Sequence, residues 1–280
     1  MSKHRVWSFL FVVLAAAAAT FIFLAVSARR SETGVPSADG SPAVSDAPTA
    51  QVKNELLKKL PAQKLLQNDY HVFQTFNNCA PAALSMALSY FGVNVSQGAL
   101  AADLRPYNNL KGIDDDKSTP PEELAEKAKE YGLIPYFRAH GTIDRLKQLL
   151  AADLPVLVRT LLYPNKDFAH YRVVKGYDDA TREFIQDDSF EGGNLRFSYD
   201  DFSQIWKPFN YGYLVLVPPE KQALIEAILG KETDPLVAWK NAAQTARWEL
   251  EVDPADTLAQ LNLAVALSYI GERAQSATAF

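Results

Sequence analysis

The chain has 280 residues, of which 48% are hydrophobic, and a formal net charge of −5. This length and composition allow one domain of ordinary size with a substantial core, together with a smaller segment. No run rich in lysine and arginine appears beyond the extreme N-terminus, so nothing indicates nucleic acid as a partner.

The N-terminus carries the clearest localisation signal. Residues 6–26 are predominantly apolar and uncharged, and basic residues flank them on both sides. About twenty such residues span a bilayer, whereas the apolar core of a cleaved signal peptide usually has about 7 to 15. We therefore predict a signal anchor over residues 1–30, a single membrane pass through residues 6–26, and a chain that is otherwise extracytoplasmic. The alternative is secretion after cleavage near the small residues Val26 to Ala28.

A spacer and then a folded domain are expected next. Residues 31–50 are mainly Ser, Pro, Ala, Gly, Asp and Thr, so they are predicted to be a disordered linker. The domain is expected over residues 51–219. A short strand is predicted over residues 70–73, just before a loop that contains the one cysteine of the chain, Cys79.

Cys79 stands where an amphipathic helix is predicted to begin. Leu84 and Leu88 recur at helical spacing, Pro81 suits a first turn, and Gly92 suits the position just past the end. The N–H groups and dipole at a helix N-terminus favour an anion, which lowers the pKa of a thiol and favours its thiolate. A lone cysteine beside alanine and leucine is also often just a small buried hydrophobe.

The rest of the domain is predicted to combine helices with an antiparallel sheet. A helix is expected from Thr119, placed as a cap before two prolines and a glutamate, and another from Thr142. Turn residues at 178–181 predict a hairpin whose first strand begins at His170. The expected strands are 133–138, 155–160, 170–177, 183–187 and 211–217, with a capped helix over 198–206. This order indicates an α+β domain.

No metal site and no cofactor are expected. A single cysteine excludes a disulfide framework within the chain, and the four histidines form no cluster with zinc-ligand spacing. The adjacent residues Asp114 to Asp116 lack the alternating ligands and the distal glutamate of a calcium-binding loop. We interpret them as part of a solvated loop.

Residues 220–280 are predicted to form a separate helical segment. Asp253–Pro254, the run from Asn262 to Ala264, Leu267 and Gly271 resemble one degenerate tetratricopeptide repeat. Such a repeat buries its apolar face only against neighbours. The segment is therefore expected to be either a short tail that packs on the preceding domain or part of a longer, truncated repeat array, with a protein as its partner.

Four motifs occur in a characteristic order along the domain. They are Gln74 with Asn78–Met86, Leu154–Val158, His170–Asp178, and Asp188–Ser189. Together they resemble the C39-like peptidase family of papain-fold cysteine proteases, over about residues 70–217. The resemblance implies a papain-like fold and cysteine peptidase activity on a peptide or protein substrate. It does not extend to the leader peptides that transporter-fused relatives cleave, because this chain has no ATP-binding motif.

The resemblance also implies a role for each site residue. Cys79 would attack the amide carbonyl as a thiolate, and His170 would hold it deprotonated and then protonate the leaving amine. Asp188 would fix the imidazole tautomer, with Asp187 as its rival because the sequence does not tell which of the two points inward. The side chain of Gln74 and the backbone N–H of Cys79 would stabilise the oxyanion.

One departure from the family pattern affects the expected activity. Ala80 follows the cysteine where the family usually has glycine, and its methyl group would narrow the substrate's approach if the backbone must lie against it. A peptide-binding module with little or no catalysis, or a cysteine amidase or acyltransferase on the same fold, are the alternatives to a peptidase. His71 and His140 lack a comparable context and are interpreted as structural.

Overall fold

The computed structural model describes residues 60–105, 118–164, 166 and 168–279. All of these lie in one unit that runs from Ser45 to Phe280. The predicted membrane pass, the linker and the aspartates 114–116 fall outside the described residues. Within the described part of the chain, no helix is both long enough and apolar enough to cross a membrane.

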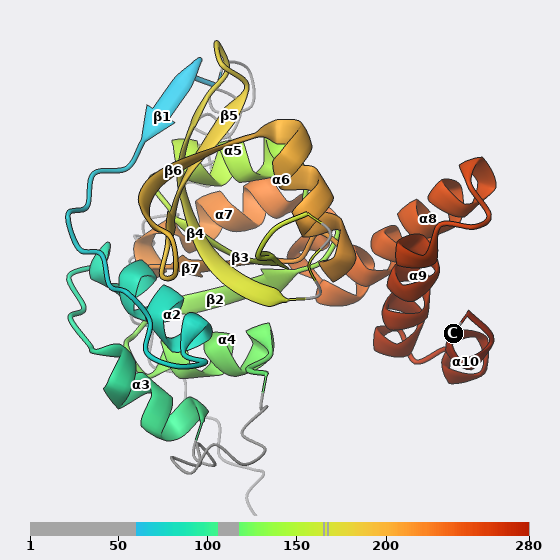
Figure 1. Cartoon of the computed structure of the whole chain (residues 1–280), viewed down its shortest axis with the longest axis horizontal. Coiled ribbons are helices and arrows are strands. Elements are labelled where there is room, and N and C mark those ends of the chain that lie inside the picture. Colours follow the sequence, from blue (N-terminus) through green and yellow to red (C-terminus); the bar gives the residue numbers. More distant parts are fainter. Residues whose placement is uncertain (1–59, 106–117, 165, 167, 280) are drawn as a thin grey trace, which may run out of the picture. The chain divides into compact units, whose positions relative to one another are not determined.

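The centre of the fold is an antiparallel sheet in the order β2-β7-β3-β4-β5-β6, with β1 paired to β4 outside this path (Figure 1). The strands are β1 (Gln63–Leu65), β2 (Ile134–Arg138), β3 (Val156–Leu161), β4 (Ala169–Asp178), β5 (Glu183–Asp188), β6 (Gly192–Ser198) and β7 (Tyr213–Val217). Strands distant in sequence are neighbours here, because β7 lies between β2 and β3.

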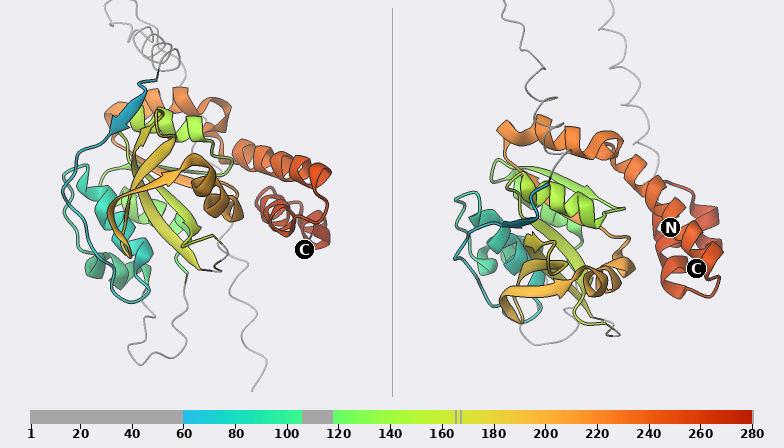
Figure 2. Two further views of the ribbon diagram at one scale, coloured as in Figure 1. Left: turned by 45° about the horizontal axis from the view of Figure 1, so that its top comes forward. Right: turned by 90° about the horizontal axis from the view of Figure 1, so that it is seen from above.

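Helices cover both faces of this sheet (Figures 1 and 2). One face carries α2 (Cys79–Ser89), α3 (Gln97–Leu104) and α4 (Pro121–Lys129), and the other carries α5 (Ile143–Ala151), α6 (Tyr199–Trp206) and α7 (Gln222–Leu229). Successive strand residues point to opposite faces. Leu214 and Leu216 of β7 accordingly pack in the cluster with α2 to α4, whereas Val215 and Val217 pack in the cluster with α5 to α7. The expected α+β architecture is confirmed.

The elements that carry the site lie close to where the sequence predicts them. The helix begins at Cys79, and Gly92 follows its end with a φ of +74°, a conformation that glycine adopts without strain. The predicted hairpin is β4 and β5, with His170 near the start of its first strand. The sequence therefore locates the helix and the hairpin that meet at the site.

Two predictions of local structure are wrong. Residues 70–73 form no strand, because the backbone N–H of Tyr70 bonds to the side chain of Asn68 and its hydroxyl bonds to Ser85 of α2. Thr119 is not the cap of α4. That position is Pro120, whereas Thr119 is buried and its carbonyl accepts a hydrogen bond from Tyr171. Helix α3 and the strands β1 and β6 are not among the elements that we predict from the sequence.

The C-terminal segment consists of α8 (Pro235–Val252), α9 (Thr257–Tyr269) and α10 (Arg273–Ala279). Short 3-10 turns, η1 (Lys207–Phe209), η2 (Pro219–Lys221) and η3 (Gly230–Thr233), lie before these helices. Trp239 of α8 packs edge-on against Phe137 of β2 and stacks on Tyr269, whose hydroxyl donates to Glu122 of α4. The segment thus packs on the sheet domain. Its tetratricopeptide character and the domain boundaries stay predictions.

Candidate active site

Cys79 is the first residue of α2, and a buried arginine fixes the loop that leads to it. Arg105, which is only 2% exposed, lies at the end of α3. Its guanidinium donates to the backbone carbonyls of Phe76 and Asn77 and to the side-chain oxygen of Asn78, the last at 2.9 Å. Three acceptors on consecutive residues leave this turn little freedom. The thiol is therefore presented from a rigid helix start.

His170 joins the thiol to a carboxylate. The imidazole of His170 is hydrogen-bonded to Cys79, and its Nε2 lies 2.8 Å from Oδ1 of Asp188. His170 is 4% exposed and Asp188 is fully buried, so water competes little for these bonds. The backbone N–H groups of Tyr171 and Ala80 also act on the thiol and lower its pKa. The structure thus brings a thiol, an imidazole and a carboxylate together in one chain of contacts.

These contacts shift the pKa of each group toward a charged state. Burial by itself would raise the pKa of the Cys79 thiol, but the hydrogen bond from His170 and its positive charge outweigh burial and lower it. Burial would lower the pKa of His170, but its bonds to Asp188 and Cys79 raise it. Both shifts move the pair toward a thiolate beside an imidazolium.

Asp188 is held on both of its oxygens. Oδ1 accepts hydrogen bonds from the backbone N–H groups of Phe190 and Glu191 at 2.7 and 3.1 Å, in addition to its contact with His170. Oδ2 forms an ion pair at 2.9 Å with Nε of Arg172, a fully buried residue of β4. Burial would raise the pKa of Asp188, but His170, Arg172 and the Phe190 N–H together lower it. The carboxylate stays ionised and fixed in position.

Asp187 faces a different set of partners. Its Oδ1 lies 2.7 Å from Nζ of Lys175 and accepts the backbone N–H of Asn194 at 2.9 Å. Both Asp187 and Lys175 are buried. Of the two adjacent aspartates, the structure places Asp188 against His170 and pairs Asp187 with a lysine.

Gln74 lies beside the end of β5 and is bound there by one residue, Ser189. The backbone N–H of Gln74 donates to the carbonyl of Ser189 at 2.7 Å, and the Ser189 hydroxyl donates to Gln74 Oε1 at 2.9 Å. Two elements distant in the sequence, the loop before Cys79 and the end of the strand with Asp188, are therefore tied together.

Ala80 turns its methyl group into the core. The residue is 3% exposed and belongs to the hydrophobic cluster beneath α2, beside Ala83 and Leu84. Its backbone is helical, and its N–H helps to lower the pKa of the Cys79 thiol. The methyl group that replaces the usual hydrogen at this position is therefore used in packing, not in lining the approach to the thiol.

The two other histidines of the described residues have structural partners. Nε2 of His71 bonds to the backbone carbonyl of Asp188 at 2.9 Å, and its ring packs edge-on against Phe73. Nδ1 of His140 lies 2.6 Å from Oε1 of Glu232, in the segment before α8. Neither bonds to the thiol.

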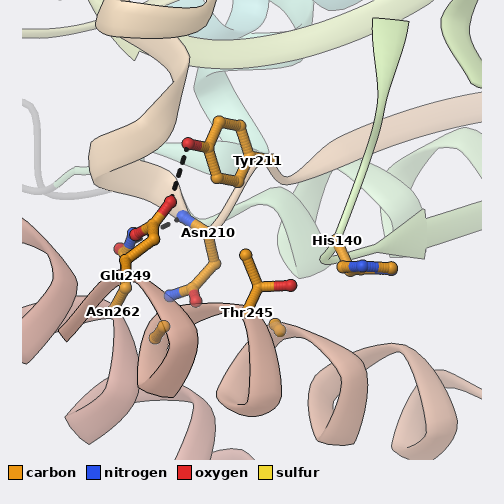
Figure 3. Close-up of a pocket in the computed structure, with 8 residues that line it drawn as sticks. His140, Asn210, Tyr211, Thr245, Glu249 and Asn262 are labelled. Carbon is orange, nitrogen blue, oxygen red and sulfur yellow. Dashed lines mark hydrogen bonds between the residues drawn. The ribbon is translucent and has the colours of Figure 1, made fainter. Parts of the chain in front are cut away.

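Two concavities elsewhere on the described part of the chain do not include Cys79. Figure 3 shows the first, where the Tyr211 hydroxyl donates to Glu249 and the Asn210 N–H donates to Asn262. Its volume of about 10 Å³ admits at most one water molecule. It is therefore a small gap in the packing of α8 and α9 against the sheet domain and not a ligand site. The second is an open groove of about 580 Å³ beyond the C-terminal end of α2, between Tyr90 and Tyr131.

The described residues also contain no group of three or more histidine, cysteine or acidic side chains suited to a metal ion. The aspartates 114–116, which we predict to form a solvated loop, lie outside them.

Three residues that shape the site have no role in the sequence-based predictions: Arg105, Arg172 and Ser189, of which the last two lie within the motifs His170–Asp178 and Asp188–Ser189. Arg172 and Lys175 are cations within a strand of otherwise apolar character, and two aspartates end the next strand. A buried cation requires a partner, so this pattern could have indicated the two ion pairs. Arg105 gives no such signal, because its acceptors are mostly backbone carbonyls.

Residues 59–214 match the Peptidase_C39 like family. Among solved structures, similar ones include a Bacillus anthracis protein described as a C39-like peptidase, with 18% identity over 55% of this chain and 97% of that chain and a TM-score of 0.46. The peptidase domain of Streptococcus ComA is 23% identical over 55% and 98%, with a TM-score of 0.40. Xylellain, a cysteine protease from Xylella fastidiosa, is 17% identical over 59% and 88%, with a TM-score of 0.39. No curated protein matches the chain.

Proposed function

The chain belongs to the Peptidase_C39 like family, and we propose that it is a cysteine peptidase that hydrolyses peptide bonds through Cys79, His170 and Asp188. The observation that carries this proposal is the continuous set of contacts from the thiol through the imidazole to the buried carboxylate. Each contact favours the ionised form that nucleophilic catalysis needs. The substrate class is a peptide or a protein.

In the proposed reaction, the thiolate of Cys79 adds to the carbonyl carbon of the scissile peptide bond. The carbonyl oxygen then carries the negative charge, which the backbone N–H of Cys79 and the side-chain amide of Gln74 would stabilise. His170, as imidazolium, gives its proton to the leaving amine, the C–N bond breaks, and a thioester remains on Cys79. A water molecule, deprotonated by His170, attacks the thioester, the C–S bond breaks, and the acid leaves while the Cys79 thiolate and the protonated His170 are regenerated.

Asp188 makes no bond to the substrate in this scheme. Its contact with Nε2 of His170 holds the ring so that the other nitrogen faces the sulfur, and its charge stabilises the imidazolium. Arg172 and two backbone N–H groups in turn hold Asp188. Preorganisation of this kind lets the groups act without rearranging during the reaction.

The test uses the fact that Cys79 is the only cysteine of the chain. The protein is incubated with a mixed peptide library, and new amino termini are identified by mass spectrometry. We expect cleavage that disappears after stoichiometric alkylation of Cys79 with iodoacetamide. Cleavage that survives complete alkylation would contradict the proposal. Peptide retained without cleavage would instead support a binding module, and ammonia release or acyl transfer would support an amidase or acyltransferase.

We further propose that residues 6–26 anchor the protein in a membrane and that the peptidase domain is extracytoplasmic. The length of the apolar run and its basic flanks support this assignment. After expression of the full chain, the protein is expected to sediment with membranes and to resist extraction by alkaline carbonate, whereas a chain without residues 1–30 stays in the supernatant. Equal behaviour of the two chains would contradict the anchor. A mature chain that begins near Ala28 would support secretion instead.

A further inference from the structure

Ser189 directly follows Asp188 at the end of β5. Its side chain is fully buried, and its hydroxyl donates to Oε1 of Gln74 at 2.9 Å. Its backbone carbonyl accepts the N–H of Gln74 at 2.7 Å. Both the main chain and the side chain of Gln74 are therefore anchored on one residue at the end of β5.

The direction of the side-chain bond determines which end of the Gln74 amide is available. A primary amide has an oxygen that only accepts hydrogen bonds and a nitrogen that only donates them. Ser189 occupies the oxygen, and among the described residues Nε2 of Gln74 has no hydrogen-bond partner. The donating end is thus left for another acceptor.

A flipped amide would cost free energy in this environment. With Nε2 of Gln74 toward Ser189, the hydroxyl oxygen of Ser189 would accept a hydrogen bond from the amide. The hydroxyl proton of Ser189 would then lose Oε1 of Gln74, which is its one acceptor among the described residues. An unsatisfied buried donor is costly. The flip would also turn Oε1 toward the negative charge that develops on the substrate carbonyl oxygen.

We propose that Ser189 is a positioning residue that orients the side-chain amide of Gln74, so that its N–H and not its carbonyl oxygen meets the oxyanion formed at Cys79. This inference rests on the proposed function. It extends that function by linking the strand end that holds Asp188 to the oxyanion site. One short segment, Asp188–Ser189, thereby supports both the imidazole and the oxyanion donor.

In Ser189→Ala, we expect the rate of peptide hydrolysis to change and the rate of Cys79 alkylation to stay the same. Peptide hydrolysis passes through an oxyanion, so kcat is expected to fall about tenfold, less than the loss of a complete oxyanion donor, with little change in KM. Alkylation of Cys79 by iodoacetamide forms no oxyanion, and its rate and pH dependence are expected to stay as in the unmodified protein. A general loosening of the site would slow both reactions together.

A double-mutant cycle with Gln74→Ala tests the assigned target of Ser189. On the Gln74→Ala background, the added change Ser189→Ala is expected to alter kcat less than about twofold, because the amide that it orients is absent. Ser189→Thr, which keeps a hydroxyl, is expected to recover most of kcat. Multiplicative effects of Ser189→Ala and Gln74→Ala would overturn the inference.

Ser85→Ala is the matched control. Ser85 is also a fully buried serine, within α2, whose hydroxyl donates to a carbonyl, that of Val95. It also bonds to the hydroxyl of Tyr70, and neither partner is Gln74. Ser85→Ala is expected to lower the thermal midpoint comparably and to leave kcat unchanged. An equal loss of kcat in the two variants would assign the effect of Ser189→Ala to stability alone and would overturn the inference.

A peptide aldehyde separates this inference from the proposed function. Addition of Cys79 to the aldehyde forms a thiohemiacetal whose oxygen takes the place of the oxyanion, so Ser189→Ala is expected to weaken binding about tenfold. If the unmodified protein cleaves no peptide, the proposed function fails, and the aldehyde still decides the role of Ser189. If it cleaves peptides and Ser189→Ala changes neither kcat nor aldehyde affinity, the inference alone is overturned.

Discussion

Replacing His170 with alanine is expected to reduce kcat for peptide hydrolysis by about 10³-fold, because the variant loses both the base that maintains the thiolate and the acid that protonates the leaving amine. The thiol then keeps the effect of burial, which raises its pKa, without the bond and charge that outweigh burial. The pH at which iodoacetamide reacts at half its maximal rate should therefore move upward, to the ordinary thiol range or above it.

The unmodified protein should show a bell-shaped dependence of kcat/KM on pH. The rate should rise as Cys79 ionises, at a pH below the ordinary thiol range because the pKa of that thiol is lowered. It should fall as His170 loses its proton, at a pH above the ordinary imidazole range because that pKa is raised.

His140→Asn is the matched control for the loss of an imidazole. His140 pairs with Glu232 and has a φ of +62°, which asparagine tolerates better than most residues. This variant should change thermal stability but not the pH dependence of alkylation. An alkylation profile of His170→Ala that coincides with that of the unmodified protein would contradict the proposed ion pair.

The position of the nucleophile helix could be predicted because its signals are local. Pro81 in the first turn, the apolar spacing through Leu88, and Gly92 with positive φ all concern neighbours in sequence. The hairpin of β4 and β5 is local in the same sense, and it brings His170 near the acidic strand end. These two elements place Cys79 and His170, whereas the roles predicted for the site residues come from the resemblance to the C39-like peptidases.

What the sequence does not reveal depends on contacts between distant segments. The placement of β7 between β2 and β3 is not marked by any local signal. The choice between Asp187 and Asp188 depends on the face of β5 on which each lies, and the register shifts between Gln186 and Asp188 and, on β4, between Val174 and Gly176. Simple alternation along a regular strand does not hold across such irregularities. Only the folded structure shows which cation pairs with which aspartate, Arg172 with Asp188 and Lys175 with Asp187.

Asp188→Asn is expected to lower kcat by about 10²-fold or more. The introduced amide could still accept a bond through its oxygen, but the atom facing Arg172 would no longer carry negative charge, and an amide N–H there would oppose the guanidinium. The raised pKa of His170 depends on its bond to Asp188 and on the charge of that carboxylate. Without them only Cys79 opposes the effect of burial on this pKa, so the descending limb of the pH profile should move to lower pH.

Asp187→Asn supplies the comparison, because the two aspartates are adjacent, equally buried and each paired with a cation of β4. Removing either charge takes from a buried cation its nearest acidic partner, so both variants should lose roughly 3 kcal/mol of stability. Activity is therefore compared at a temperature where circular dichroism shows both variants to be folded. Only Asp188→Asn should move the descending limb and lower kcat, because only Asp188 contacts His170. If both variants lose kcat equally and the descending limb of neither pH profile moves, Asp188 has only a structural role and is not the third catalytic residue.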